Sequence, residues 1–118
     1  MFGHRPFKVI ADYLSRNGYA VLRTDDRGIG QSTGDATLAT TDDFAEDAKY
    51  AVESLKKLDA LKNRPVGIIG HSEGGSIAIK CAPSVDFTIT LAAPAIQGDS
   101  IILTQTKAML DASGKGFA

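Results

Sequence analysis

Apolar residues recur along the chain with two different spacings, which predict helices alternating with strands. A repeat of three to four residues predicts helices over residues 6–17, 42–61, 73–82 and about 100–112. Short and mostly apolar runs predict buried strands over residues 19–24, 66–70 and 87–92. Because a helix separates successive strands, the strands need crossover connections and should pair in parallel. The pattern therefore predicts an α/β fold, a three-layer sandwich with a mainly parallel sheet.

Residues that favour helix ends stand at the boundaries of these segments. Gly18 follows the first helix and suits a left-handed cap. Thr40 or Thr41 is expected to cap the second helix, and Asp99 or Ser100 the last one. These boundaries support the assignment of helices.

The segment Gly-His-Ser-Glu-Gly at residues 70–74 carries the most specific chemical pattern in the chain. It reads G-x-S-x-G and joins a predicted strand to a predicted helix, which is typical of a nucleophile elbow. Ser72 is therefore the candidate catalytic nucleophile, and the backbone N–H of Glu73 is the candidate oxyanion donor. We expect positions 70 and 74 to require glycine, because the bend is tight and the helix packs close to the strand.

Composition narrows the class of protein. The chain has 118 residues and a formal net charge of −1, so we expect one domain over residues 1–118 and no binding to nucleic acid or membranes. The single cysteine, Cys81, excludes an intrachain disulfide and fits a reducing compartment and a place in the core. Without an apolar leader or a membrane-length apolar run, a soluble cytoplasmic protein is expected. We expect neither a cofactor nor a metal.

Together with the elbow, the segment Asp-Arg-Gly-Ile-Gly-Gln-Ser at residues 26–32 resembles the α/β-hydrolase superfamily. Residues 3–7 and 91–94 are similar to its esterase and acyl-peptidase-like branch. The resemblance implies a partial α/β-hydrolase fold and hydrolysis of a small-molecule ester, thioester or amide through an acyl-enzyme on Ser72. It also implies that the family's first three strands would precede Met1, and that its triad acid and histidine would follow Ala118.

The resemblance therefore identifies a central piece of a hydrolase, which we expect to be weak or inactive as this isolated chain. The alternative is a non-catalytic, truncated α/β module that self-associates. In the family, a further strand lies between those predicted here over residues 19–24 and 66–70. That slot either closes or is filled by another chain, so we expect a homo-oligomer.

Two histidines are available as a base. His71 adjoins the serine, and neighbouring residues at a sharp turn usually point in different directions, so it is more simply a packed residue of the elbow. His4 precedes the first helix at the expected carboxyl edge of the sheet, which makes it a candidate for the edge of the site. A solvated histidine at a helix start explains it more simply.

Acidic residues offer no clear triad partner. Asp26 and Arg27 follow the first predicted strand and are candidates for the edge of the site, although an ion pair holding the loop is the simpler interpretation. Asp99 follows the third predicted strand, where a few members of the superfamily place the acid, although a helix cap explains it more simply. The general base and the acid therefore stay unidentified from the sequence.

Overall fold

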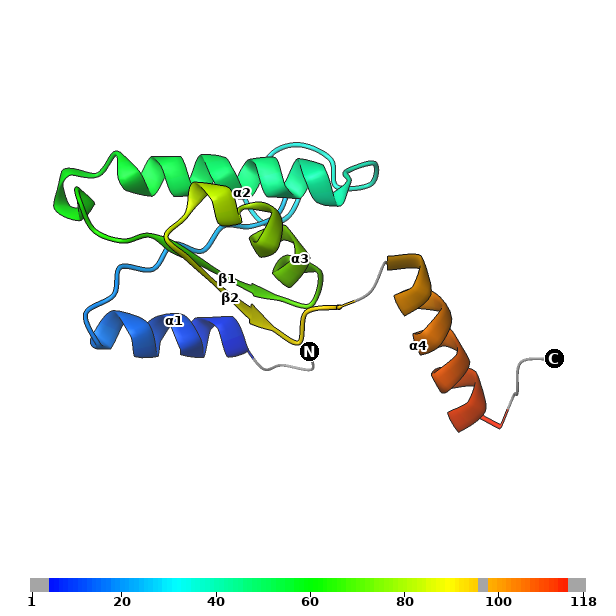
Figure 1. Cartoon of the computed structure of the whole chain (residues 1–118). Coiled ribbons are helices and arrows are strands. Elements are labelled where there is room, and N and C mark those ends of the chain that lie inside the picture. Colours follow the sequence, from blue (N-terminus) through cyan, green and yellow to red (C-terminus); the bar gives the residue numbers. More distant parts are fainter. Residues whose placement is uncertain (1–4, 96–97, 115–118) are drawn as a thin grey trace. The chain divides into compact units, whose positions relative to one another are not determined.

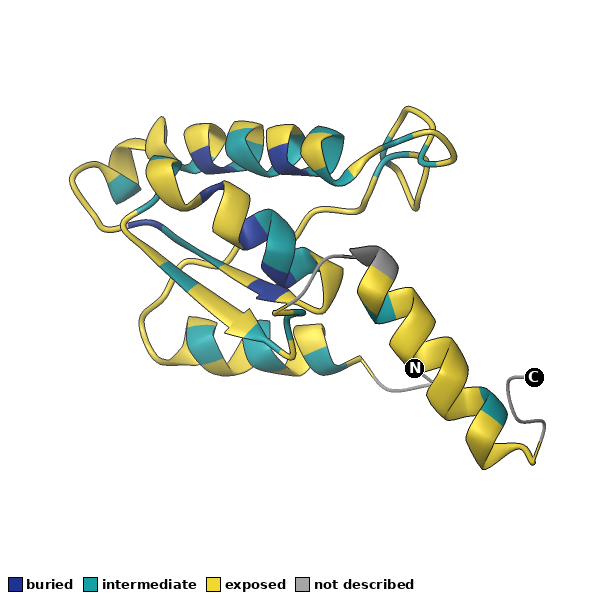
Figure 2. Ribbon diagram, turned by 45° about the vertical axis from the view of Figure 1, so that its right-hand side comes forward, coloured by how far each residue is buried: buried dark blue, intermediate teal, exposed yellow. Residues whose placement is uncertain are grey.

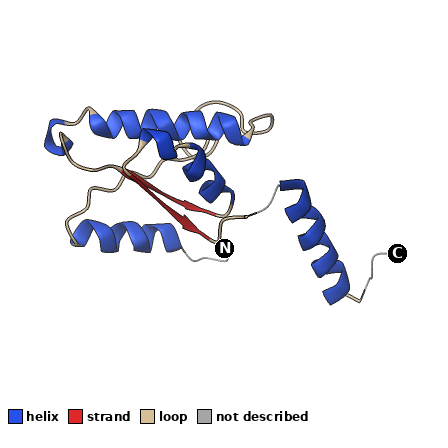
Figure 3. Ribbon diagram, in the orientation of Figure 1, coloured by secondary structure: helices blue, strands red, loops and turns tan. Residues whose placement is uncertain are grey.

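The computed structural model describes residues 5–95 and 98–114, which belong to two compact units, residues 1–38 and residues 39–118. The elements of the described chain, in order, are α1 (Pro6–Arg16), α2 (Thr41–Lys56), the 3-10 turn η1 (Asp59–Leu61), β1 (Gly67–His71), α3 (Glu73–Lys80), the 3-10 turn η2 (Ala82–Ser84), β2 (Phe87–Leu91) and α4 (Gly98–Ala112) (Figures 1 and 3).

The first unit consists of α1 and the loop that follows it. Pro6 stands in the first turn, where its missing N–H costs no hydrogen bond. Gly18 has φ 89°, so the predicted left-handed cap after the helix is confirmed. The amide of Tyr19 donates to the carbonyl of Leu14 at 3.1 Å, which closes the end of α1.

The strand predicted over residues 19–24 is wrong. No strand is assigned there, and Tyr19 and Leu22 are 60% and 46% exposed instead of buried. The residues have the composition of a strand, but a strand also needs a hydrogen-bonded neighbour. Within the described ranges, β1 and β2 pair only with each other, so this segment has no ladder to join.

The second unit contains the parallel pair formed by β1 and β2. Register runs from Gly67 opposite Phe87 to His71 opposite Leu91. The two expected strands and their parallel pairing are confirmed, and the unit is compatible with a partial α/β fold. The ring of Phe87 lies over Gly67, where a built Cβ would come within 2.2 Å of it, so an aromatic side chain covers the glycine across the strands.

Helix α3 covers one face of this sheet, and α2 packs against α3 (Figure 1). The buried apolar residues lie on the facing sides of these elements (Figure 2). They are Ala45, Val52, Val66, Ala78 and Cys81. The Cys81 thiol donates to the carbonyl of Ala45 at 3.3 Å and is fully buried, so its predicted place in the core is confirmed.

Helix α2 begins where the sequence predicts. Thr40 is the N-cap: its hydroxyl accepts from the amide of Asp43 at 3.3 Å, and the Asp43 carboxylate accepts from the amide of Thr40 at 2.7 Å. The helix ends at Lys56, short of the predicted residue 61, and the chain turns into η1.

Helix α4 is the last element of the described chain. It begins at Gly98, so Asp99 and Ser100 lie within its first turn and neither is its N-cap as predicted. Gly114 just beyond it has φ 71°. No helix in the described part of the chain is long and apolar enough to cross a membrane.

Candidate active site

Ser72 occupies an unusual backbone conformation between the end of β1 and the start of α3. Its φ is 54° and its ψ is −122°. A non-glycine residue rarely adopts positive φ, and such a conformation costs on the order of 1–3 kcal/mol. The residue therefore needs surroundings that hold it in place.

Two backbone hydrogen bonds hold the bend from both sides. The amide of Ser72 donates to the carbonyl of Leu91 at 3.0 Å, which extends the ladder between β1 and β2 by one bond. The carbonyl of Ser72 accepts from the amide of Gly75 at 2.9 Å, in the first turn of α3. The peptide groups on either side of the serine are thus fixed by the sheet and by the helix.

Close packing of the helix on the strand accounts for two glycines near the bend. A Cβ built on Gly70 would lie 1.9 Å from the carbonyl oxygen of Gly74, and one on Gly75 would lie 2.4 Å from the Cβ of Ala93. A Cβ on Gly74 would meet nothing within 4 Å. The expected steric need for glycine is therefore correct at Gly70 and wrong at Gly74, since the helix approaches the strand through the carbonyl of Gly74 and not through its Cα.

The Ser72 side chain is exposed, and its hydroxyl has no hydrogen-bond partner in residues 5–95 and 98–114. The amide of Glu73, the first residue of α3, likewise has no acceptor in those ranges. Both groups stand at the N-terminal end of a helix, where the helix dipole favours negative charge. The candidate nucleophile and the candidate oxyanion donor are thus on adjacent, exposed residues.

The side chain of Glu73 is tied to the neighbouring helix. The hydroxyl of Thr41, the first residue of α2, donates to Oε1 of Glu73 at 3.2 Å. Asp42, the next residue of α2, forms an exposed ion pair of 2.8 Å with Lys80 at the end of α3. From the sequence, Thr41 is expected only as a cap, because no local pattern indicates that residues 41 and 73 meet.

A second residue with positive φ adjoins the elbow. Ala92, directly after β2, has φ 49°, and the preceding residue, Leu91, accepts the amide of Ser72. Both strands of the sheet therefore leave it through strained backbone at the same carboxyl edge. Sequence reasoning missed Ala92, since alanine gives no signal for positive φ.

The structure does not test the other predicted site residues, His4, Asp26 and Arg27, against Ser72. His4 lies outside the described residues. Asp26 and Arg27 belong to the first unit, in a loop where the Ser32 hydroxyl donates to the carbonyl of Asp25 at 2.8 Å. Their place at the edge of the site stays a prediction.

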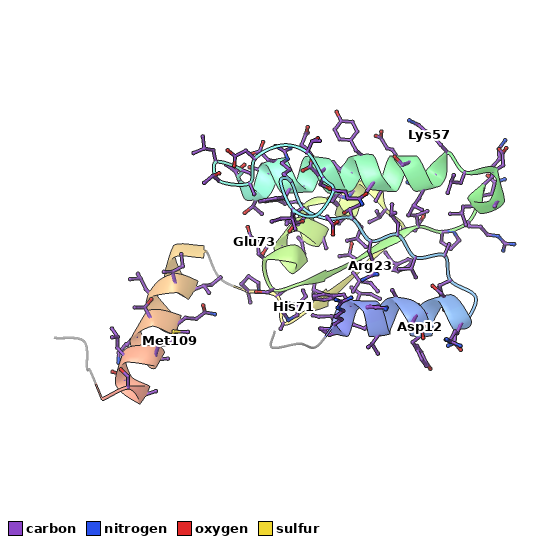
Figure 4. The ribbon with its side chains drawn as sticks, turned by 180° about the vertical axis from the view of Figure 1, so that it is seen from behind. Asp12, Arg23, Lys57, His71, Glu73 and Met109 are labelled. Carbon is purple, nitrogen blue, oxygen red and sulfur yellow. The ribbon has the colours of Figure 1, made fainter. Side chains whose placement is uncertain are left out.

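His71 and Asp99, the other candidates for proton transfer, stay untested. Figure 4 shows His71 at the end of β1 and Glu73 at the start of α3, and His71 is exposed. Asp99 lies in the first turn of α4. Among the residues described, no group of three His, Cys, Asp or Glu side chains could hold a metal ion.

Comparison with known proteins identifies a family that covers most of the chain. A family model described as "Serine aminopeptidase, S33" matches residues 5–115. No curated protein and no solved structure matches the chain. The matched range includes both the elbow and the loop of residues 26–32.

Proposed function

The chain belongs to the serine aminopeptidase S33 family of α/β-hydrolases, and we propose that Ser72 is the nucleophile with which it hydrolyses a small ester, thioester or amide. The single observation that carries this proposal is the conformation of Ser72, at φ 54° with an exposed hydroxyl at the end of a strand. Strained backbone of this kind persists only where the surroundings enforce it, and it concentrates at functional sites.

The reaction follows from the groups at the elbow. Ser72 Oγ attacks the carbonyl carbon, its proton passes to a base, and the carbonyl oxygen becomes an oxyanion that accepts a hydrogen bond from the amide of Glu73. The tetrahedral intermediate expels an alcohol, thiol or amine, which takes up a proton, and leaves an acyl group on Ser72. Water then attacks the acyl-enzyme and releases the carboxylic acid.

Slow turnover by this chain alone is part of the proposal. No described group accepts a hydrogen bond from the Ser72 hydroxyl, so its proton has no acceptor in place among residues 5–95 and 98–114. Without its triad, a hydrolase retains only about 10³–10⁴-fold acceleration over water, from its oxyanion hole and substrate binding. We expect activated esters to be hydrolysed very slowly or not at all.

Labelling with a fluorophosphonate tests the nucleophile directly, because Ser72 Oγ would form a bond to phosphorus as fluoride leaves. We expect slow labelling of the wild-type chain, acceleration by added imidazole as an external base, and no labelling of Ser72→Ala. Ser76→Ala, one turn further along α3, is the matched control and should be labelled at the wild-type rate. Labelling that persists in Ser72→Ala, or no labelling of the wild type even with imidazole, would contradict the proposal.

The second candidate function is a self-associating module without turnover, and the exposed sheet favours it. Ile69, Phe87 and Ile89 are 42–45% exposed, and the described strands have no neighbour at either outer edge. Unpaired edges invite strand addition. Light scattering at micromolar concentration should then report a dimer or larger assembly, and a monomer would refute this candidate.

The lone buried Cys81 suits a reducing compartment such as the cytoplasm under either candidate function.

A further inference from the structure

Glu73 has two roles at the elbow that conflict. Its backbone amide is the proposed oxyanion donor, while its side chain carries a negative charge on the same residue. An oxyanion beside that amide would be repelled by a carboxylate that turned toward it, since charges at short range interact appreciably even in water. A device that keeps the carboxylate away would therefore matter to the chemistry.

The structure contains such a device in α2. Oγ1 of Thr41 donates to Oε1 of Glu73 at 3.2 Å, and this is a side-chain contact between residues 32 positions apart in the sequence. Lys80, at the other end of α3, pairs with Asp42 at 2.8 Å. Thr41 is thus the residue of α2 that holds the Glu73 carboxylate.

We propose that Thr41 is a positioning residue for the oxyanion donor: its hydroxyl holds the Glu73 carboxylate against α2, away from the position where the oxyanion forms. This inference rests on the proposed function of Ser72 and extends it to a residue of another helix. In this role Thr41 acts through Glu73.

The test measures labelling of Ser72 by a fluorophosphonate, with imidazole present, in four variants. Thr41→Val, which keeps the shape but loses the hydroxyl, should be labelled about three- to ten-fold more slowly, the lower end of the effect expected for one nearby charge. Thr41→Ser should restore the wild-type rate. In Glu73→Gln the side chain carries no charge, so loss of the Thr41 hydroxyl should no longer slow labelling. The double variant Thr41→Val/Glu73→Gln should therefore be labelled at the rate of Glu73→Gln within about two-fold.

Salt separates this electrostatic role from a merely structural one. At about 1 M salt the screening length falls to about 3 Å, so the defect of Thr41→Val should shrink to within about two-fold of the wild type. Thr37→Val is the matched control, because the Thr37 hydroxyl also donates to a carboxylate, that of Asp35. It should be labelled at the wild-type rate. A defect that survives high salt, or one of equal size in the Glu73→Gln background, would overturn the proposal.

A second readout keeps the test independent of reactivity. The amide resonance of Glu73 in a nitrogen–proton NMR spectrum should shift in Thr41→Val and stay in place in Thr41→Ser. If the wild type is not labelled at all, the proposed function fails, while a shift confined to Thr41→Val still supports the hold on Glu73. If the resonance does not move in either variant, the inference about Thr41 is wrong whatever the labelling shows.

Discussion

Replacing each glycine of the elbow motif by alanine tests how closely α3 is packed on β1, because the two positions differ in their surroundings. A Cβ at Gly70 would lie 1.9 Å from the carbonyl oxygen of Gly74 and 2.7 Å from the amide nitrogen of Gly75. Carbon atoms pack best at about 3.5–4.0 Å. The contacts are to backbone, so no side-chain rotation relieves them, and the helix must shift.

The expected cost follows from this overlap. Overpacking in a core costs about 1–3 kcal/mol and sometimes more, and we expect Gly70→Ala to lie at about 3 kcal/mol because the obstacle is rigid. Gly74→Ala is the matched control within the same motif. Its Cβ meets nothing within 4 Å, and alanine is favoured over glycine in a helix by about 0.5–1 kcal/mol, so this variant should be as stable as the wild type or slightly more so.

Urea unfolding followed by circular dichroism measures both changes. With a denaturant slope of about 1–3 kcal/mol per molar, a loss of 3 kcal/mol lowers the midpoint by about 1–3 M. A Gly70→Ala chain that does not fold points the same way. A wild-type midpoint for Gly70→Ala, or a larger loss in Gly74→Ala than in Gly70→Ala, would refute the packing argument.

Two further predictions concern the second unit. Thr40→Ala removes the capping hydroxyl of α2 and should lower the free energy of unfolding by about 1 kcal/mol in the same urea assay; an unchanged midpoint would show that the cap contributes nothing. Burial raises the pKa of the Cys81 thiol above its ordinary 9.0, so the folded chain keeps this proton to higher pH than the unfolded chain does. Stability should therefore be full below about pH 9 and fall as the pH rises through the raised pKa, and Cys81→Ala should lose less stability than the wild type between about pH 7 and pH 10.

The helices could be predicted where their signals are local. The cap and the apolar stripe of α2 lie within a few turns of each other, and its start at Thr41 follows directly from the sequence. Its end does not. Leu58 continues the apolar spacing past Lys56, yet it is 52% exposed, and the chain turns there. Apolar spacing alone does not say whether a side chain finds a surface to cover.

A strand could be predicted correctly only where a neighbouring strand to pair with it could also be predicted. The runs at residues 66–70 and 87–92 are each other's neighbour and form β1 and β2. The run at residues 19–24 has a similar composition, but no ladder reaches it in the described part of the chain. Composition reports a preference for a pleated surface, whereas a strand forms only when a second segment supplies the hydrogen bonds.

In the candidate site, too, the features set by neighbouring residues could be predicted and the contacts between distant segments could not. The turn that presents Ser72 depends on its immediate neighbours, above all on Gly70, so a short motif suffices to predict it. The contact of Thr41 with Glu73 spans two helices, and no spacing in the sequence reveals it. A contact of this kind emerges only from the packing of α2 on α3.

In a catalytic triad, the base and the acid that transfer the proton of the serine come from segments distant in the sequence. The elbow motif alone therefore cannot identify them. A base must come within hydrogen-bond reach of Ser72 Oγ, and an acid must orient the base; both depend on elements that meet in space, not along the chain. The elbow requires neither, because its strain is held by backbone bonds to Leu91 and Gly75. A chain can therefore present the nucleophile in its reactive geometry without holding a base in place to accept the proton. Acceleration by imidazole distinguishes that condition from an elbow that has lost its reactivity altogether.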